Sequence, residues 1–100
     1  MFCITTQYRT QPADLEAAVR VFTDIAVAII REQLGFQDLC LLSKADGELL
    51  LITMWDTEEQ AITWSKPLDY RKIGTVLEPL LVAGPSMDGY RVQIHVSAQD

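Results

Sequence analysis

Hydrophobic and polar positions follow a strand period at the start of the chain and a helical period after it. In residues 2–9 every second side chain falls on one side, namely Phe2, Ile4, Thr6 and Tyr8, which is typical of a half-buried β-strand. Residues 15–34 carry one apolar helical stripe made of Leu15, Ala18, Val19, Phe22, Ile25, Ala26 and Ile29. Asp14 is the expected N-cap of this helix, and Gly35 is the left-handed residue expected to end it.

Two apolar runs predict a β-hairpin in the middle of the chain. Residues 38–45 and 48–55 surround Asp46-Gly47, a dipeptide typical of tight hairpin turns. Apolar residues stand at consecutive positions in 39–42 and 49–52, which indicates a sheet covered on both faces. Since the chain contains only enough helix for one layer, we expect a second subunit on the other face.

The last third of the chain predicts two helical pieces and a strand. Residues 57–60 (Thr-Glu-Glu-Gln) fit a capping box, so a helix should start there and run through Trp64. After an interruption at Pro67, a second piece is expected over about 68–77 and should end at Pro79. Residues 80–85 should then connect to a final strand at about 90–97, where apolar and polar residues alternate.

This order of elements predicts an α+β fold. Strand, helix, strand, strand, helix and strand form the ferredoxin-like split β-α-β arrangement, with an antiparallel sheet and helices on one face. A chain of 100 residues is enough for one domain, so residues 1–100 are expected to form a single unit.

Composition and charge add a partner and exclude several classes of protein. Hydrophobic residues make up 49% of the chain, which in so small a domain leaves apolar surface for a homodimer. The net charge of -6 argues against nucleic acid and anionic membranes as partners. No secretory signal or bilayer-spanning run is visible, and Cys3 and Cys40 read as reduced thiols, so we expect a cytoplasmic protein. No residues show metal-ligand spacing.

Three features together resemble a known family. They are the β-rich start, the long helix that ends at 34–36 (Leu-Gly-Phe), and residues 52–61 (Ile-Thr-Met-Trp-Asp-Thr-Glu-Glu-Gln-Ala). They are similar to the antibiotic-biosynthesis monooxygenase domains of the dimeric α+β barrel superfamily, over roughly the whole chain. The resemblance implies a homodimer with sheets packed back to back and a pocket between sheet and helices in each subunit. It is more specific for the fold than for any activity.

The leading function that the resemblance implies is a cofactor-independent monooxygenase acting on a small aromatic or quinol-type substrate. Such an enzyme removes a substrate proton and stabilises the anion in an apolar pocket. The catalytic candidates are His95 as a general base, with Trp64 and Gln7 for positioning. Relatives often place a pocket-facing asparagine on the first strand, and Gln7 is the nearest amide in a sequence without asparagine. The substrate-binding candidates are Phe22, Tyr70, Gln93 and Arg91.

Several of these residues have an equally simple structural interpretation. Trp64 and Phe22 could be core aromatics, and His95 could be a hydrogen-bonded sheet or interface residue. The alternative function is therefore a non-catalytic dimeric module that binds a small hydrophobic ligand or serves assembly. Haem degradation is disfavoured, because relatives with that activity carry an iron-binding histidine after the tryptophan. Here residues 70–75 read Tyr-Arg-Lys-Ile-Gly-Thr, so Tyr70 would have to replace that ligand, and no cofactor is expected.

Overall fold

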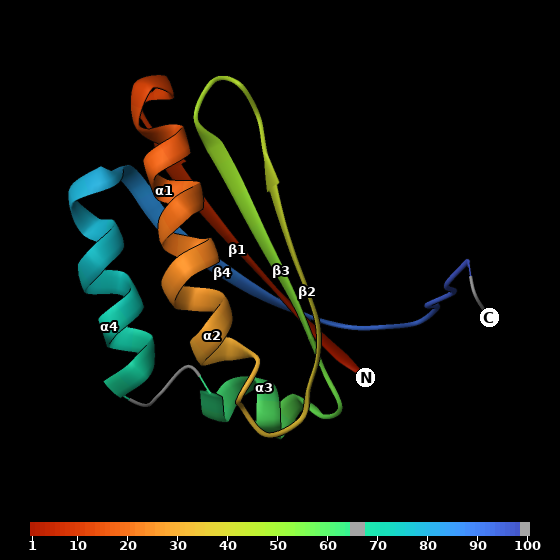
Figure 1. Ribbon diagram of the computed structural model, residues 1–100. Helices are drawn as coiled ribbons and strands as arrows, with labels where there is room; N and C mark the ends of the chain where they lie inside the picture. The colour runs from red at the N-terminus through yellow and green to blue at the C-terminus, as the bar shows by residue number, and fades with distance from the viewer. Residues whose placement is uncertain (65–67, 99–100) are drawn as a thin grey trace.

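The computed structural model describes residues 1–64 and 68–98, with the backbone alone described for 68–70. Four strands form one antiparallel sheet in the order β2-β3-β1-β4. Their bounds are β1 Phe2–Thr10, β2 Phe36–Ser43, β3 Glu48–Trp55 and β4 Leu81–Arg91. Helices pack on one face of this sheet (Figure 1). The fold is α+β and ferredoxin-like, as the order of elements predicts.

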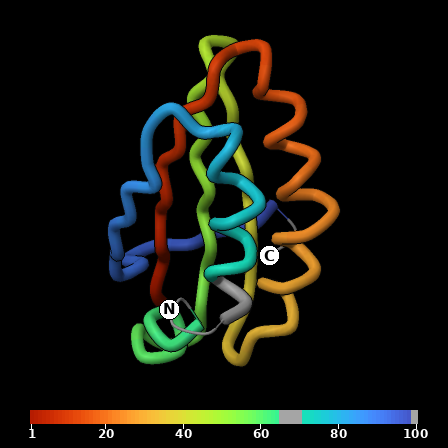
Figure 2. Tube along the Cα trace, turned by 90° about the vertical axis from the view of Figure 1, so that its left-hand side faces the viewer, coloured from red at the N-terminus to blue at the C-terminus, as the bar shows by residue number. Residues whose placement is uncertain are grey.

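The helical layer has two main parts. The first is a continuous long helix that comprises η1 Pro12–Asp14, α1 Leu15–Val21, the π-helical turn η2 Phe22–Ala26 and α2 Val27–Ile30. The second comprises α4 Leu68–Leu77 and η3 Glu78–Leu80, and the short α3 Glu58–Trp64 precedes it. Figure 2, seen from the helical side, shows the strands beneath these helices, with β4 at one edge of the sheet and β2 at the other.

The long helix ends earlier than predicted, at Ile30 rather than Leu34. The backbone N–H of Gln33 bonds to the Ile30 carbonyl, and its side-chain amide donates to the Ile29 carbonyl at 3.0 Å, which satisfies the last turn. Gly35 then adopts a φ of +86°, as expected for the left-handed residue that follows a helix. At the other end Asp14 occupies the N-cap position, but its side chain makes no capping hydrogen bond.

The core lies between the sheet and the helical layer. Alternate residues of β3 face the helices and are buried, namely Leu49, Leu51, Thr53 and Trp55. The long helix contributes Ala18, Phe22, Ala26 and Ile30, and α4 contributes Ile73 and Leu77. The predicted stripe of the long helix is therefore confirmed in its central positions, and its outer members are partly buried.

The opposite side of the sheet, here called the open face, has no helix over it in the described part of the chain (Figure 1). The register pairs Cys40 with Ile52 and Leu42 with Leu50, so these four side chains share that face. Leu42 is 46% exposed and Cys40 is also exposed, while Leu50 and Ile52 are only partly buried. The double-sided apolar pattern of the hairpin thus corresponds to one face under helices and one apolar face without cover.

The last strand differs from the prediction. Residues 80–85 were expected to be a connection, but β4 begins at Leu81 and ends at Arg91. Because β4 is an edge strand that pairs only with β1, the missing N–H of Pro85 is tolerated there. Gly84 and Pro85 together oppose the single residue Tyr8, which makes a β-bulge. A local Gly-Pro signal therefore marked a bulge rather than the end of a strand.

The alternating segment at the end of the chain leaves the sheet instead of joining it. The backbone N–H of Val92 bonds to the Met1 carbonyl at 3.1 Å, and the following residues run away from the body (Figure 1). Ile94 and Val96 are 85% and 80% exposed. The predicted strand at 90–97 is wrong beyond Arg91, because β1 has no further residues with which this segment could pair.

Gly47 should be essential to the hairpin turn. It has a φ of +102°, and its carbonyl accepts hydrogen bonds from the backbone N–H (2.8 Å) and hydroxyl (3.1 Å) of Thr10. A Cβ at this position would collide with the Thr10 carbonyl oxygen. We expect Gly47→Ala to lower the free energy of unfolding, measured in urea, by about 2 kcal/mol.

Gly74→Ala is the matched control for this substitution. Gly74 lies within α4, and a Cβ there would have no neighbour within 4 Å. We expect this variant to be as stable as the parent or more stable by up to about 1 kcal/mol, because alanine favours a helix over glycine. Equal urea midpoints for the two variants would contradict the argument.

Candidate functional site

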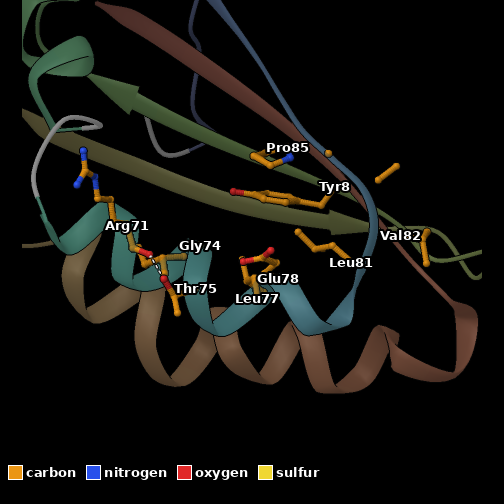
Figure 3. Close-up of a pocket in the computed structure, with 12 residues that line it drawn as sticks. Tyr8, Arg71, Gly74, Thr75, Leu77, Glu78, Leu81, Val82 and Pro85 are labelled. Atoms are coloured by element: carbon orange, nitrogen blue, oxygen red, sulfur yellow. Dashed lines mark hydrogen bonds between the residues drawn. The ribbon is translucent and has the colours of Figure 1, made fainter.

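A cavity lies between the second helical segment (α4 and η3) and the sheet edge formed by β1 and β4 (Figure 3). Its volume is about 580 Å³, which is within the range of small-molecule sites. The walls are mainly apolar and include Ile73, Leu77, Leu81, Val82 and Pro85. The polar side chains that line it are Tyr8, Arg71, Thr75 and Glu78.

Tyr8 lines the cavity because it occupies one of the alternate positions of β1 whose side chains face the helices. It belongs to the row that faces the helices, and it is 7% exposed. The ring of Phe22 contacts it edge to face, with centroids 5.3 Å apart and planes at 65°, which holds the Tyr8 ring in place. The bulge at Gly84 and Pro85 stands directly opposite Tyr8. Bulges often occur beside active sites, since they open a sheet edge locally and redirect side chains.

Helix α4 supplies the facing wall. Arg71, Thr75 and Glu78 recur at intervals of four and three residues, so they share one side of the helical segment. The Thr75 hydroxyl donates a hydrogen bond to the Arg71 carbonyl at 2.9 Å. Gly74, on the same side, leaves open space where another residue would place a side chain. The absence of a side chain at Gly74 therefore widens the cavity next to Arg71.

The cavity has a positive and a negative end. Arg71 and Glu78 are seven residues apart, or about two helical turns. Among the side chains that the structure describes, those of residues 1–64 and 71–98, the salt bridges are confined to the hairpin region, where Arg9 pairs with Asp46 and Glu48, and Lys44 with Glu48. Neither charged group of the cavity takes part in them. A bound molecule would thus meet a guanidinium at one end and a carboxylate at the other.

A family comparison identifies the type of domain. The family described as antibiotic biosynthesis monooxygenase matches residues 1–74. The chain belongs to the antibiotic biosynthesis monooxygenase family. The resemblance seen in the sequence is thereby confirmed at the level of the family. A search of curated proteins found no relative that matches the chain.

Solved structures agree on the fold of this antibiotic biosynthesis monooxygenase domain. SnoaB from Streptomyces nogalater, a cofactor-independent oxygenase, is similar with a TM-score of 0.75 and 18% identity over 95% of each chain. Rv0793 from Mycobacterium tuberculosis has a TM-score of 0.77 and 18% identity, covering 96% of this chain and 98% of that one. A protein of unknown function from Nitrosomonas europaea reaches 0.82 at 9% identity, covering 96% and 92%. At these identities the likeness establishes the fold alone.

The sequence-predicted site residues do not come together in the structure. Trp64 is 5% exposed and stacks on Trp55, with ring centroids 5.6 Å apart and planes at 15°. Its edge lines a separate hollow with Gln33 and Gln60, away from the α4 cavity. Phe22 is 2% exposed and lies behind Tyr8, so it supports the cavity wall from the core.

The remaining predicted residues lie outside the α4 cavity or outside the described part. Gln7 is exposed and has the opposite parity to Tyr8, so it points to the open face. His95 borders a hollow with Cys40 and Ile52 of that face. Arg91 and Gln93 border another hollow beside the start of α3. The side chain of Tyr70 is outside the described residues, and so is Pro67.

Sequence reasoning missed Tyr8, Arg71 and Glu78 as site residues. A signal for Tyr8 was available, because alternation in the first strand places it on the helix-facing row and places Gln7 on the other. The two residues of α4 and η3, Arg71 and Glu78, gave no such signal, since a charged residue on a short helix is most often simply solvated.

None of the helices in the described part has the length and apolar character needed to span a bilayer.

Proposed function

We propose that this chain is a cofactor-independent monooxygenase that oxidises a small aromatic or quinol-type molecule in the α4 cavity. The observation that carries the proposal is the 580 Å³ apolar cavity with the buried Tyr8 ring in its wall. Membership of the antibiotic biosynthesis monooxygenase family supports it, and so does the fold shared with SnoaB, which is a cofactor-independent oxygenase. The position of this cavity between sheet and helices supports its assignment as the pocket that the resemblance implies.

The reaction requires a substrate that supplies all the electrons. A ring CH₂ group, as in an anthrone, loses a proton, and the resulting carbanion passes an electron to O₂. Recombination and loss of water convert CH₂ into C=O, so that one oxygen atom enters the product and the other leaves as H₂O. The protein has to accept the proton, stabilise the anion and keep out bulk water.

The cavity residues fit these roles. The Tyr8 hydroxyl can donate a hydrogen bond to the developing oxyanion, and the apolar side chains around it reduce the local dielectric constant. Glu78 lines the cavity and carries a carboxylate that can accept a proton. His95, the other candidate base, lies beside the open face. We therefore propose Glu78 for this role and Tyr8 for stabilisation of the anion.

Tyr8→Phe is the variant that tests the proposal. It removes the hydroxyl and keeps the ring that packs on Phe22, so the fold should be retained. In metal-stripped protein with a panel of anthrones and quinols, we expect saturable oxygen consumption whose kcat/KM falls about tenfold in the variant. His95→Ala should stay within about twofold of the parent.

Two results would decide against this assignment. Loss of activity in His95→Ala with full activity in Tyr8→Phe would move the site to the open face. Oxygen consumption by none of the panel, together with saturable binding of the same compounds, would favour the alternative function, a non-catalytic module that binds a small hydrophobic ligand.

We also propose a homodimer, in which the open faces of two copies pack together. The exposed apolar side chains Leu42 and Tyr90 support this arrangement, together with the partly buried row of β3. Back-to-back packing is the arrangement that the family resemblance implies.

The cytoplasm is the proposed compartment, in agreement with the free thiols of Cys3 and Cys40.

A further inference from the structure

One cationic side chain lines the cavity among the described residues, and that is Arg71. In the described part of the chain its guanidinium has no carboxylate within 4 Å, whereas Arg9 and Lys44 are both paired. The protein as a whole carries a net charge of -6. Among the described side chains, the cavity is therefore bordered by a guanidinium that no protein carboxylate neutralises.

Tyr8 adds a second polar group to the cavity wall, between Arg71 and Val82 in the view of Figure 3. In Figure 3 its ring runs between Pro85 and α4, and the hydroxyl lies at the end nearer to Arg71 and away from Val82. The Glu78 carboxylate lies toward the other end of the helical segment. The guanidinium is a charged donor and the hydroxyl end of Tyr8 is turned toward its side of the cavity, so the Arg71 side is suited to an oxygen anion.

We infer that the α4 cavity selects an aromatic ligand that carries an oxyanion, a carboxylate or an ionised phenol, with the anion at Arg71 and the ring among the apolar walls. The inference rests on the proposed function in one respect, since it takes this cavity as the place where the substrate binds. It adds the charge and the orientation of that substrate. Neither follows from the family or from the fold.

Electrostatics gives both selectivity and orientation. An anion approaching a protein of charge -6 is repelled over most of its surface and attracted at Arg71. Arg71 itself is exposed, so the apolar walls contribute by holding the ring of the ligand beside the guanidinium. A ligand turned end for end would bring its anion to Glu78, which disfavours that orientation. The ring is then held with one defined edge toward Tyr8.

A matched pair of probes tests the inference without any turnover. The probes are 2-naphthoate and 2-naphthamide, which have nearly the same shape and differ in charge, and their affinities are measured by calorimetry at low salt. We expect the protein to bind 2-naphthoate about tenfold more tightly than 2-naphthamide. The preference should shrink as salt is raised, because an exposed guanidinium is screened. 2,4-Dinitrophenolate in place of 2-naphthoate shows whether a phenolate is accepted as well as a carboxylate.

Arg71→Gln and Lys72→Gln form the decisive pair of variants. Both remove one positive charge from neighbouring positions of α4, but only Arg71 lines the cavity. We expect Arg71→Gln to bind 2-naphthoate and 2-naphthamide equally, with the affinity for the amide unchanged. Lys72→Gln should keep the tenfold preference to within about twofold. Circular dichroism melting confirms that both variants are folded.

Three outcomes would overturn the inference. They are equal binding of the two probes by the parent protein, binding of neither probe, and an equal loss of preference in both variants, which would indicate a general charge effect. Failure of the proposed reaction gives a different pattern, in which Arg71-dependent binding of the anion persists and no substrate consumes oxygen. Oxygen consumption with neutral substrates that is unchanged in Arg71→Gln would support the reaction and overturn the inference.

Discussion

Trp55→Ala should lower the free energy of unfolding by about 3–5 kcal/mol. Trp55 ends β3 and is fully buried between Trp64, stacked at 5.6 Å, and Phe36, which meets it edge to face at 5.8 Å. Its indole N–H donates to the Thr53 hydroxyl at 2.9 Å. Because folded domains are stable by about 5–15 kcal/mol, this loss is a large fraction of the total stability.

Urea denaturation followed by circular dichroism measures this loss, and Trp55→Phe provides the control. The smaller ring keeps most of the aromatic packing but loses the hydrogen bond to Thr53, so about 1–2 kcal/mol should be lost. A loss below about 1 kcal/mol for Trp55→Ala would show that this aromatic cluster does not hold α3 against the sheet.

Elements with strong local signals could be predicted from the sequence. The hairpin follows from two apolar runs around Asp46-Gly47, and the structure shows Gly47 in the left-handed region. The start of α3 follows from its capping box, and the Gln60 N–H does bond to the Thr57 hydroxyl at 3.1 Å. In both cases the interacting residues are within a few positions of each other, so a short window of sequence contains the cause.

The last strand could not be placed because its cause is long-range. Residues 90–97 alternate as well as any strand in the chain, and residues 84–85 look like a break. What decides the outcome is the length of β1, which pairs with Leu81–Arg91 and has nothing left for the residues beyond. Local alternation alone does not make a strand, because pairing needs a partner in register.

The candidate site was missed for a related reason. Its residues come from β1, α4, η3 and β4, and the cavity exists only because α4 lies beside the bulge opposite Tyr8. Family resemblance directed attention to an amide at the position of Gln7, whereas the strand parity in this chain turns Gln7 to the open face. The side of the sheet to which Gln7 and Tyr8 point could have been predicted from the alternation in the sequence. The position of Arg71 relative to Tyr8 depends on how α4 packs on the sheet.

Ile52→Asp should convert the proposed homodimer into monomers. Ile52 lies in β3 on the open face, with Cys40 on one side and Thr5 on the other. In a symmetric dimer this face meets its own copy, so the substitution would bury two carboxylates at once. Because each unpaired ion costs several kcal/mol to desolvate, we expect the dimer dissociation constant to rise about 1000-fold or more. Light scattering at micromolar concentration measures the change in mass.

Cysteine alkylation gives an independent measure of the same interface. Cys40 is exposed in the single chain and would be covered in the dimer, so it should react slowly in the parent protein and faster in Ile52→Asp. Burial raises the pKa of the Cys3 thiol, so a smaller fraction is thiolate at a given pH than for a freely exposed cysteine. Cys3 should accordingly react slowly, even in the monomer, at about pH 8.

Ala17→Asp separates an interface effect from a simple effect of added charge. Ala17 is exposed on α1, on the helical side of the molecule, and it acquires the same carboxylate. This variant should remain dimeric, and its Cys40 should stay protected from alkylation. Ile52→Asp should be monomeric with a reactive Cys40. Its helical circular dichroism signal should be retained. A parent protein that is monomeric at micromolar concentration would contradict the proposed dimer. The open face would then require a partner other than a second copy, because seven apolar or sulfur-containing side chains point to it, namely Cys3, Cys40, Leu42, Leu50, Ile52, Met54 and Tyr90.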